Sequence, residues 1–190
     1  MFDGFDGFDV FDDRNGEATM EEPPYGSVIV GVDGSAAALA ALRWSAAKAE
    51  QLRTRVVAVH AWLPTASLRA PYATAVGLPT PEEERRRAAA TLEETVARLL
   101  DLYPEARISA LLDQGPPAPV LLRHARHALL LTLGRGSRED VTLPALGAVA
   151  RECVRHATCP VVTVPEPPAD AKEAELPWLF ENTTLGLERA

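Results

Sequence analysis

Short apolar runs alternate with amphipathic segments from residue 27 to residue 165, and this alternation restricts the possible folds more than any other feature of the sequence. The runs are rich in valine, leucine and alanine and predict five strands, at residues 27–32, 55–61, 106–112, 129–133 and 160–165. The segments between them predict four crossover helices, which begin near residues 36, 81, 117 and 144. Buried strands joined by helices form parallel sheets with helices on both faces. The sequence therefore predicts a three-layer α/β domain with a five-stranded parallel sheet over residues 25–165.

The sequence clearly marks the ends of one predicted strand and the start of one predicted helix. Pro160 and Pro165 bracket the last run, and proline cannot donate to a sheet ladder, so we expect an edge strand or a strand that pairs with another copy. Ahead of the second helix, Thr80 suits the N-cap, Pro81 suits the first helical position, and Glu83 can complete a capping box.

Composition and charge exclude several classes of protein. The chain has 190 residues and a formal net charge of -8, whereas a nucleic-acid binder needs clustered Lys and Arg. No apolar run approaches the roughly 18 residues of a membrane span, so we expect no membrane partner. The two cysteines, Cys153 and Cys159, and the absence of a signal-peptide pattern at the N-terminus predict a cytoplasmic protein.

Both ends of the chain lie outside the predicted domain. In residues 1–24 a Phe-Asp pair recurs every three residues, and such a segment cannot bury enough surface to form a core. Residues 166–190 combine proline and acidic residues with an apolar cluster at 176–180. We expect two disordered acidic tails, and the alternative is that the tails dock protein partners.

The stretch 133–149 is the main candidate for ligand binding. It follows a buried run, turns at Gly134 and Gly136, and leads into the fourth predicted helix. A strand, a glycine loop and a helix N-terminus together hold phosphate, because backbone N–H groups point at the anion. Arg135 and Arg138 can add charge-assisted hydrogen bonds.

Asp33 supplies a second polar group for the same site. Asp33 follows the first predicted strand, and Gly134 follows the fourth. Ligands of such sheets bind at the carboxyl ends of strands where the strand order reverses. If the first and fourth strands are neighbours, Asp33 and the glycine loop face one crevice.

Four segments, taken in order, resemble the universal stress protein family. Val-Ile-Val-Gly-Val-Asp-Gly-Ser at 28–35 looks like the first strand and turn of that family, and Val-His-Ala-Trp at 59–62 looks like the end of its second strand. Gln-Gly-Pro-Pro-Ala at 114–118 resembles the turn before its third helix. Cys-Pro-Val-Val-Thr-Val-Pro at 159–165 resembles its last strand, so the resemblance covers residues 25–165.

The resemblance implies a Rossmann-like adenine-nucleotide-binding fold of the universal stress type, and a homodimer paired through the last strand, Val161–Val164. One branch of the family binds ATP through a pattern of Gly, two residues, Gly, nine residues and Gly-Ser/Thr, which falls here on Gly134, Ser137, Gly147 and Ala148. The implied pocket consists of Val32, Asp33, Ala61, Leu133, Gly134, Gly136, Ser137, Gly147, Ala148 and Val149.

The resemblance also implies roles within this pocket. Asp33 corresponds to the aspartate that meets the adenosine end of the nucleotide, and Ala61 corresponds to a position that lines the adenine. Val32 and Leu133 would flank the base.

This sequence departs from the ATP-binding pattern at two positions. Ser137 carries a Cβ where the binders of the family bare the backbone. Ala148 lacks a hydroxyl donor, a loss of about 0.5–1.5 kcal/mol. Glu139 and Asp140 would repel phosphates if they faced inward. We therefore expect ATP binding to be weak or absent, with Mg²⁺ bound only together with ATP.

The remaining reactive side chains have structural interpretations. Ser35 suits a helix start, His60 ends a strand, and Cys153 lies on the apolar face of a predicted helix. His124 and His127 lie three residues apart, but no nearby Cys, Asp or Glu completes a metal site, so we expect exposed helix-end residues. No catalytic residue and no metal ligand is predicted.

The sequence favours a non-enzymatic stress-response regulatory or binding module with a degenerate adenine-nucleotide pocket. The alternative is a dimeric protein-interaction scaffold that binds no nucleotide. A slow ATP hydrolase is the third hypothesis, and it is less favoured because no residue is placed as a general base.

Overall fold

The structure is a computed structural model that describes residues 10–11, 25–68, 79–136 and 146–166. Its strands are β1 (Val10–Phe11), β2 (Val28–Gly31), β3 (Val56–Trp62), β4 (Ile108–Gln114), β5 (Leu130–Arg135) and β6 (Val161–Pro165). Its helices are α1 (Ala36–Leu52), the 3₁₀ helix η1 (Thr65–Leu68), α2 (Pro81–Leu100), α3 (Pro117–His124) and α4 (Ala148–His156). The predicted alternation of strands and helices is confirmed.

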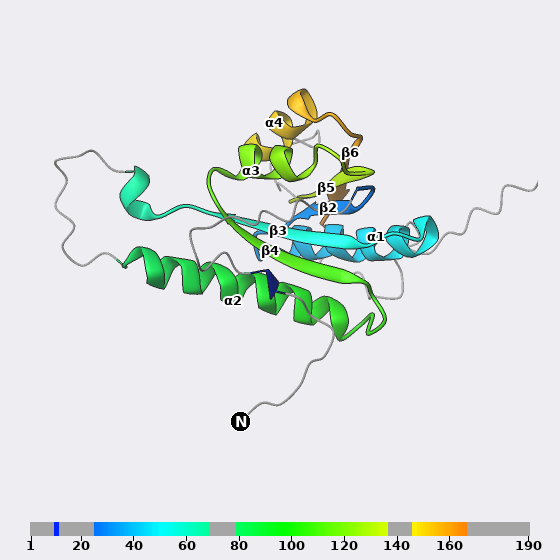
Figure 1. The fold of residues 1–190 in the computed structure, drawn as a ribbon, viewed down its shortest axis with the longest axis horizontal. Coiled ribbons are helices and arrows are strands. Elements are labelled where there is room, and N and C mark those ends of the chain that lie inside the picture. The colour runs from blue at the N-terminus through cyan, green and yellow to red at the C-terminus, as the bar shows by residue number, and fades with distance from the viewer. Residues whose placement is uncertain (1–9, 12–24, 69–78, 137–145, 167–190) are drawn as a thin grey trace, which may run out of the picture.

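The strands form one parallel sheet in the order β1-β4-β3-β2-β5-β6. The helices α1 and α2 cover one face of the sheet, and α3 and α4 cover the other (Figure 1). This arrangement confirms the predicted three-layer α/β fold with five parallel strands, to which the two-residue β1 is added at the edge of β4.

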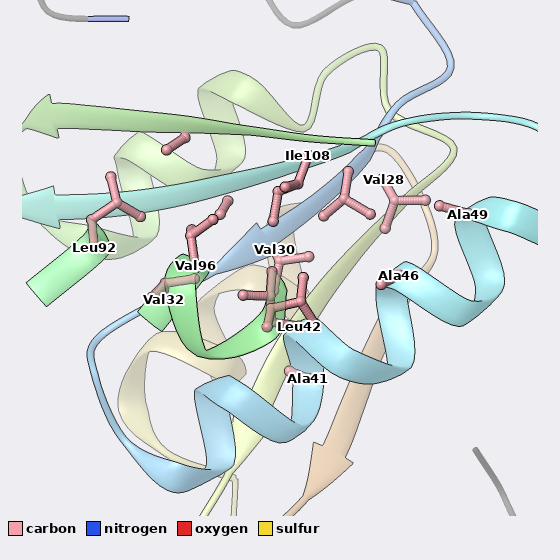
Figure 2. Packing of buried hydrophobic residues seen from close by; sticks show 14 of the residues in the cluster. Val28, Val30, Val32, Ala41, Leu42, Ala46, Ala49, Leu92, Val96 and Ile108 are labelled. Carbon is pink, nitrogen blue, oxygen red and sulfur yellow. The ribbon is translucent and has the colours of Figure 1, made fainter. Parts of the chain in front are cut away.

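The central strand β2 is buried on both faces. Val28, Ile29 and Val30 each have 0% exposed surface. Val28 and Val30 pack with Leu42 of α1 and Val96 of α2 (Figure 2), whereas Ile29 packs on the opposite face, under α3 and α4. Each fully buried side chain of this kind contributes about 1.5–3 kcal/mol. Double-sided burial explains why this run has no alternation of apolar and polar residues.

The two outer strands differ in how well they were predicted. β6 lies at one edge of the sheet, as the prolines of its run predicted. At the other edge, Val10–Phe11 pairs in parallel with Ala110 and Leu111 of β4, although no element was predicted in the first 24 residues. Apart from Glu166, the rest of both tails lies outside the described residues.

The fourth helix begins later than predicted. α4 starts at Ala148, and its N-cap Gly147 has an extended backbone with φ -62° and ψ 166°, so a helix continuous from Pro144 is wrong. Val154 was predicted on the buried face but is 52% exposed. Of the nine residues of α4, Ala150 and Cys153 are buried, and Val149 also packs against the core.

No helix in the described part of the chain is both long and apolar enough to cross a membrane.

The capping box predicted at the start of α2 is present. Thr80 Oγ1 accepts from the Glu83 backbone N–H at 3.2 Å, and the Thr80 N–H donates to Glu83 Oε2 at 2.7 Å. The backbone hydrogen bond from Thr80, with the side-chain bond second, lowers the pKa of Glu83 from 4.5. The reciprocal bonds fix the first turn of α2.

We predict that Thr80→Ala lowers the free energy of unfolding by about 1 kcal/mol, because one N–H of the first turn loses its acceptor. Urea unfolding followed by circular dichroism measures the change. Glu83→Gln is the matched control, since glutamine also completes a capping box, and its effect should be smaller. Equal stability of Thr80→Ala and the parent chain would contradict this account of the helix start.

Candidate functional site

The predicted site lies where the order of the strands reverses. β2 pairs with β3 on one side and with β5 on the other, so Gly31 stands in register with Val59 and with Leu133. The condition stated from the sequence, that the first and fourth predicted strands are neighbours, is therefore met. Asp33 and Gly134 lie at the carboxyl ends of adjacent strands, at the kind of switch point where doubly wound sheets bind ligands.

Asp33 is held by the turn that starts α1. Its Oδ1 accepts from the Ser35 N–H at 3.0 Å, and Ser35 Oγ in turn caps the helix by accepting from the Ala38 N–H at 3.1 Å. Gly34 between them has φ +83°, a conformation that glycine adopts without strain. Asp33 itself is exposed. The predicted capping role of Ser35 is confirmed, and Asp33 presents an accessible carboxylate in a fixed turn.

Gly134 is required by packing. A Cβ at Gly134 would lie 2.4 Å from the carbonyl carbon of Ala37 and 2.6 Å from the Ala38 nitrogen, both backbone atoms of the first turn of α1. Backbone cannot move aside as a flexible side chain can. The glycine therefore allows α1 to lie directly on β5, whether or not a ligand binds nearby.

The other two glycines predicted for the pocket, Gly136 and Gly147, are not constrained in this way. A Cβ at Gly136 would have Glu166 Oε2 as its nearest neighbour, at 3.8 Å, and a Cβ at Gly147 would meet nothing within 4 Å among the described residues. The Glu166 N–H donates to the Arg135 carbonyl at 2.9 Å, which places its carboxylate beside the loop. Ser137 and residues 138–145 lie outside the described residues.

Two of the residues predicted to surround the adenine, Val32 and Leu133, pack their side chains in the hydrophobic core. Val32 belongs to the core under α1 and α2, and Leu133 belongs to the core under α3 and α4. His60 Nδ1 donates to the Val32 carbonyl at 2.6 Å, which agrees with the structural interpretation of this histidine. Ala61 is half-buried at the end of β3. The side chains of Val32 and Leu133 therefore pack in the core and do not contact a ligand. A ligand at the carboxyl ends of β2 and β5 would contact the backbone there.

Two groups near the predicted phosphate-binding loop can attract an anion. The N-cap Gly147 gives no side-chain cap to α4, so the N–H groups of Val149 and Ala150 lack that acceptor, and the first turn has no acidic residue. Arg135 Nε is shielded from solvent and has no hydrogen-bond partner in the described part of the chain. Positive potential and free donors are the features that attract phosphate to a helix start.

Sequence reasoning missed a cluster at the end of β4. His124 was expected to be an exposed residue without an acidic neighbour, but its side chain is only 10% exposed and its Nε2 lies 2.6 Å from Asp113 Oδ2. Arg123 Nη2 donates to the same oxygen. Burial alone would raise the pKa of Asp113, but the hydrogen bonds from His124 and Arg123 outweigh it and hold that pKa below 3.8. Helical spacing could not reveal this contact, because Asp113 belongs to the preceding strand.

The other reactive side chains behave as predicted. His127 is exposed and stacks on Tyr25 with ring centroids 4.4 Å apart. Cys153 is buried, and burial raises the pKa of its thiol to about 11, with smaller contributions from Glu152 and Cys159. Across the described ranges, no group of three or more His, Cys, Asp or Glu side chains is placed to hold a metal ion.

The fold and the switch point together define a doubly wound α/β domain of the Rossmann-like class. Residues 24–165 match the universal stress protein family, and the chain belongs to this family. This result confirms the resemblance found in the sequence.

Curated relatives occur in mycobacteria. A universal stress protein of Mycolicibacterium smegmatis is 30% identical over 137 residues, which is 72% of this chain and 45% of that protein. One from Mycobacterium tuberculosis is 30% identical over 159 residues, or 80% of this chain and 49% of the relative. The chain thus spans about half the length of these relatives.

Solved structures show the same fold. The universal stress protein UspA from Lactobacillus plantarum matches with a TM-score of 0.59 and 20% identity, covering 74% of this chain and 97% of that one. A universal stress protein in complex with cAMP matches with a TM-score of 0.53 and 22% identity, covering 75% and 98% of the two chains.

We predict that Gly134→Ala lowers the free energy of unfolding by about 2 kcal/mol, since the added methyl group forces α1 away from β5. Gly136→Ala is the matched control and should change stability by less than about 0.5 kcal/mol, because its nearest neighbour leaves ordinary van der Waals space. Urea unfolding of both variants measures the difference. Equal effects would show that the close approach at Gly134 does not govern packing.

We predict that Asp113→Asn lowers the stability at neutral pH by about 1 kcal/mol, because the half-exposed pair with Arg123 and the bond to His124 are weakened. Since folding lowers the pKa of Asp113, its contribution is fully present above pH 3.8 and is lost as the pH falls through the lower folded value. The variant should therefore lose less stability than the parent on acidification below pH 3.8. Urea unfolding at several pH values tests this, with the exposed Asp101→Asn as control.

Proposed function

We propose that this chain is a non-enzymatic stress-response module that binds an adenine nucleotide weakly at the switch point between β2 and β5. The exposed Asp33, held in a fixed turn beside the end of β5, is the observation that carries the proposal. A carboxylate in this position can accept hydrogen bonds from ligand hydroxyls, as Asp33 would from a ribose. The solved relative in complex with cAMP supports an adenine nucleotide as the class of ligand.

The charges beside the loop favour a nucleotide with few phosphates. Arg135 and the uncapped start of α4 attract an anion, but the Glu166 carboxylate lies next to Gly136, where a chain of phosphates would pass. Repulsion between like charges grows with the number of phosphates. This balance supports weak binding of ATP, with Mg²⁺ entering only with the triphosphate.

A dimeric scaffold that binds no nucleotide is the second candidate. β6 pairs only with β5 among the described strands, so its outer edge is open to another strand. We propose that two copies pair through Val161–Val164 at this edge, in the manner of strand addition. The tails are the proposed sites for protein partners.

Native mass spectrometry with cAMP, AMP and ATP, the last with and without Mg²⁺, tests both candidates because it reads oligomeric state and bound ligand together. We expect a dimer that retains cAMP or AMP more readily than ATP. Asp33→Asn should weaken binding about tenfold or more, since a hydrogen bond to a charged group contributes about 1.5–3 kcal/mol. Asp101→Asn, which removes an equal charge at the far end of α2, is the matched control.

Glu166→Gln tests the charge argument. This variant should bind ATP more tightly while its affinity for cAMP changes less, because only the longer phosphate chain meets the carboxylate. A dimer that stays free of every nucleotide at millimolar concentration would contradict the nucleotide proposal and favour the scaffold. Phosphate release from ATP that Asp33→Asn abolishes would instead contradict the non-enzymatic role.

A further inference from the structure

The face of β4 that points away from α2 is partly open to solvent. Ile108 and Ala110, which pack in the core under α1 and α2, are 7% and 0% exposed. Side chains alternate along a strand, so Ser109 and Leu111 point to the other face, and both are only half-buried. On that face α3 packs on β2 and β3, and it reaches β4 at Asp113. Ser109 and Leu111 therefore form an open strip on β4.

Two neighbouring arginines lie at the amino end of the open strip. The Val56 N–H donates to the Arg107 carbonyl at 2.9 Å, so Arg107 lies beside Arg55 where the ladder between β3 and β4 begins. Both arginines are exposed, and alternation places Arg107 on the same face as Ser109. Neither guanidinium forms an ion pair or hydrogen bond with another described residue, Glu105 included. Two like charges side by side repel each other, and an anion between them relieves that repulsion.

The strand β1 brings an acidic and aromatic segment of the chain to this strip. Val10 and Phe11 pair in parallel with Ala110 and Leu111. Because the pairing is parallel, the chain enters β1 from the amino end of β4, where Arg107 lies. Residues 2–9, directly before β1, contain three phenylalanines, three aspartates and no lysine or arginine. Their charge complements the two arginines, and their aromatic rings complement the apolar surface of Leu111.

We propose that residues 2–9 of the same chain lie across the open strip of β4 and cover it. The aspartates pair with Arg107 and Arg55, and the phenylalanine rings pack on Leu111. Such a segment spans about 26 Å when extended, whereas adjacent strands lie about 4.8 Å apart, so it is long enough to reach both arginines. Exposed ion pairs contribute little individually. The pairing of β1 with β4 compensates, because it keeps the segment at a high local concentration.

The docked segment regulates access to the amino-terminal tail. A protein partner of that tail, as in the scaffold proposal, has to release residues 2–9 from β4 before it can bind them. The strip and the partner therefore compete for the same phenylalanines and aspartates. The docking itself depends on neither the nucleotide proposal nor the scaffold proposal.

Nuclear magnetic resonance of the full chain with a nitroxide at Gly4→Cys tests the proposal. Cys159 is replaced by serine so that the label attaches to one site, since Cys153 is buried. The nitroxide should broaden the amide signals of Arg107, Ser109 and Leu111, and should leave the signal of Leu39 on the opposite face sharp. High salt should weaken the broadening, because exposed ion pairs are screened. Isotope-labelled chain without nitroxide, mixed with unlabelled chain that carries it, should show no broadening.

Charge variants separate docking from the mere proximity of β1. Replacing Arg55 and Arg107 by glutamine, or Asp3, Asp6 and Asp9 by asparagine, should reduce the broadening about twofold or more. The matched controls remove equal charge elsewhere: Lys48→Gln with Arg151→Gln, and Glu17, Glu21 and Glu22 replaced by glutamine. These controls should leave the broadening unchanged.

Three results would overturn the proposal. The first is sharp signals at Arg107, Ser109 and Leu111 in the nitroxide-labelled chain. The second is broadening in the mixed sample, which would assign the strip to the segment of a second copy. The third is equal broadening in the charge variants and the parent chain.

Discussion

The contact between the first turn of α1 and β5 is the constraint on which the arrangement of this domain depends. At Gly134 the two backbones approach so closely that a side chain cannot fit between them. α1 therefore lies directly over the central strands, and its start, with Asp33 and Ser35, stands beside the carboxyl end of β5. The same contact closes the core in which Val28 and Val30 are buried.

The close contact between α1 and β5 changes how the glycines of this loop are interpreted. In the sequence, Gly134 and Gly136 are interpreted as bare backbone for a ligand, and Gly134 and Gly147 match the phosphate-binding pattern of the family. In the structure, Gly134 has a complete explanation in packing, whereas Gly136 and Gly147 have room for a side chain. The argument for a ligand therefore moves from the glycines to Asp33, Arg135 and the uncapped start of α4.

Most of the fold could be predicted from the sequence because the patterns that specify each helix and strand are local. The valine-rich run of β2, the capping box at Thr80 and the prolines around β6 each depend on neighbours within a few residues. The late start of α4 was missed because Pro144 looked like a first helical residue, whereas the extended backbone at Gly147 sets the boundary. The contacts of Asp113 with Arg123 and His124 were missed because they join β4 to α3, and no spacing along the chain encodes them.

The order of the strands also has a consequence for how the domain folds. The central strand β2 pairs Val28 with Leu130, about a hundred positions further along the chain, whereas β3 pairs with β2, and β4 with β3, through shorter connections. Pairing of distant segments costs more chain entropy and slows folding. The switch point can therefore close only after β5 has been synthesised and docked, so a nascent chain that has already formed the β2–β3–β4 half presents Asp33 on an unfinished sheet edge.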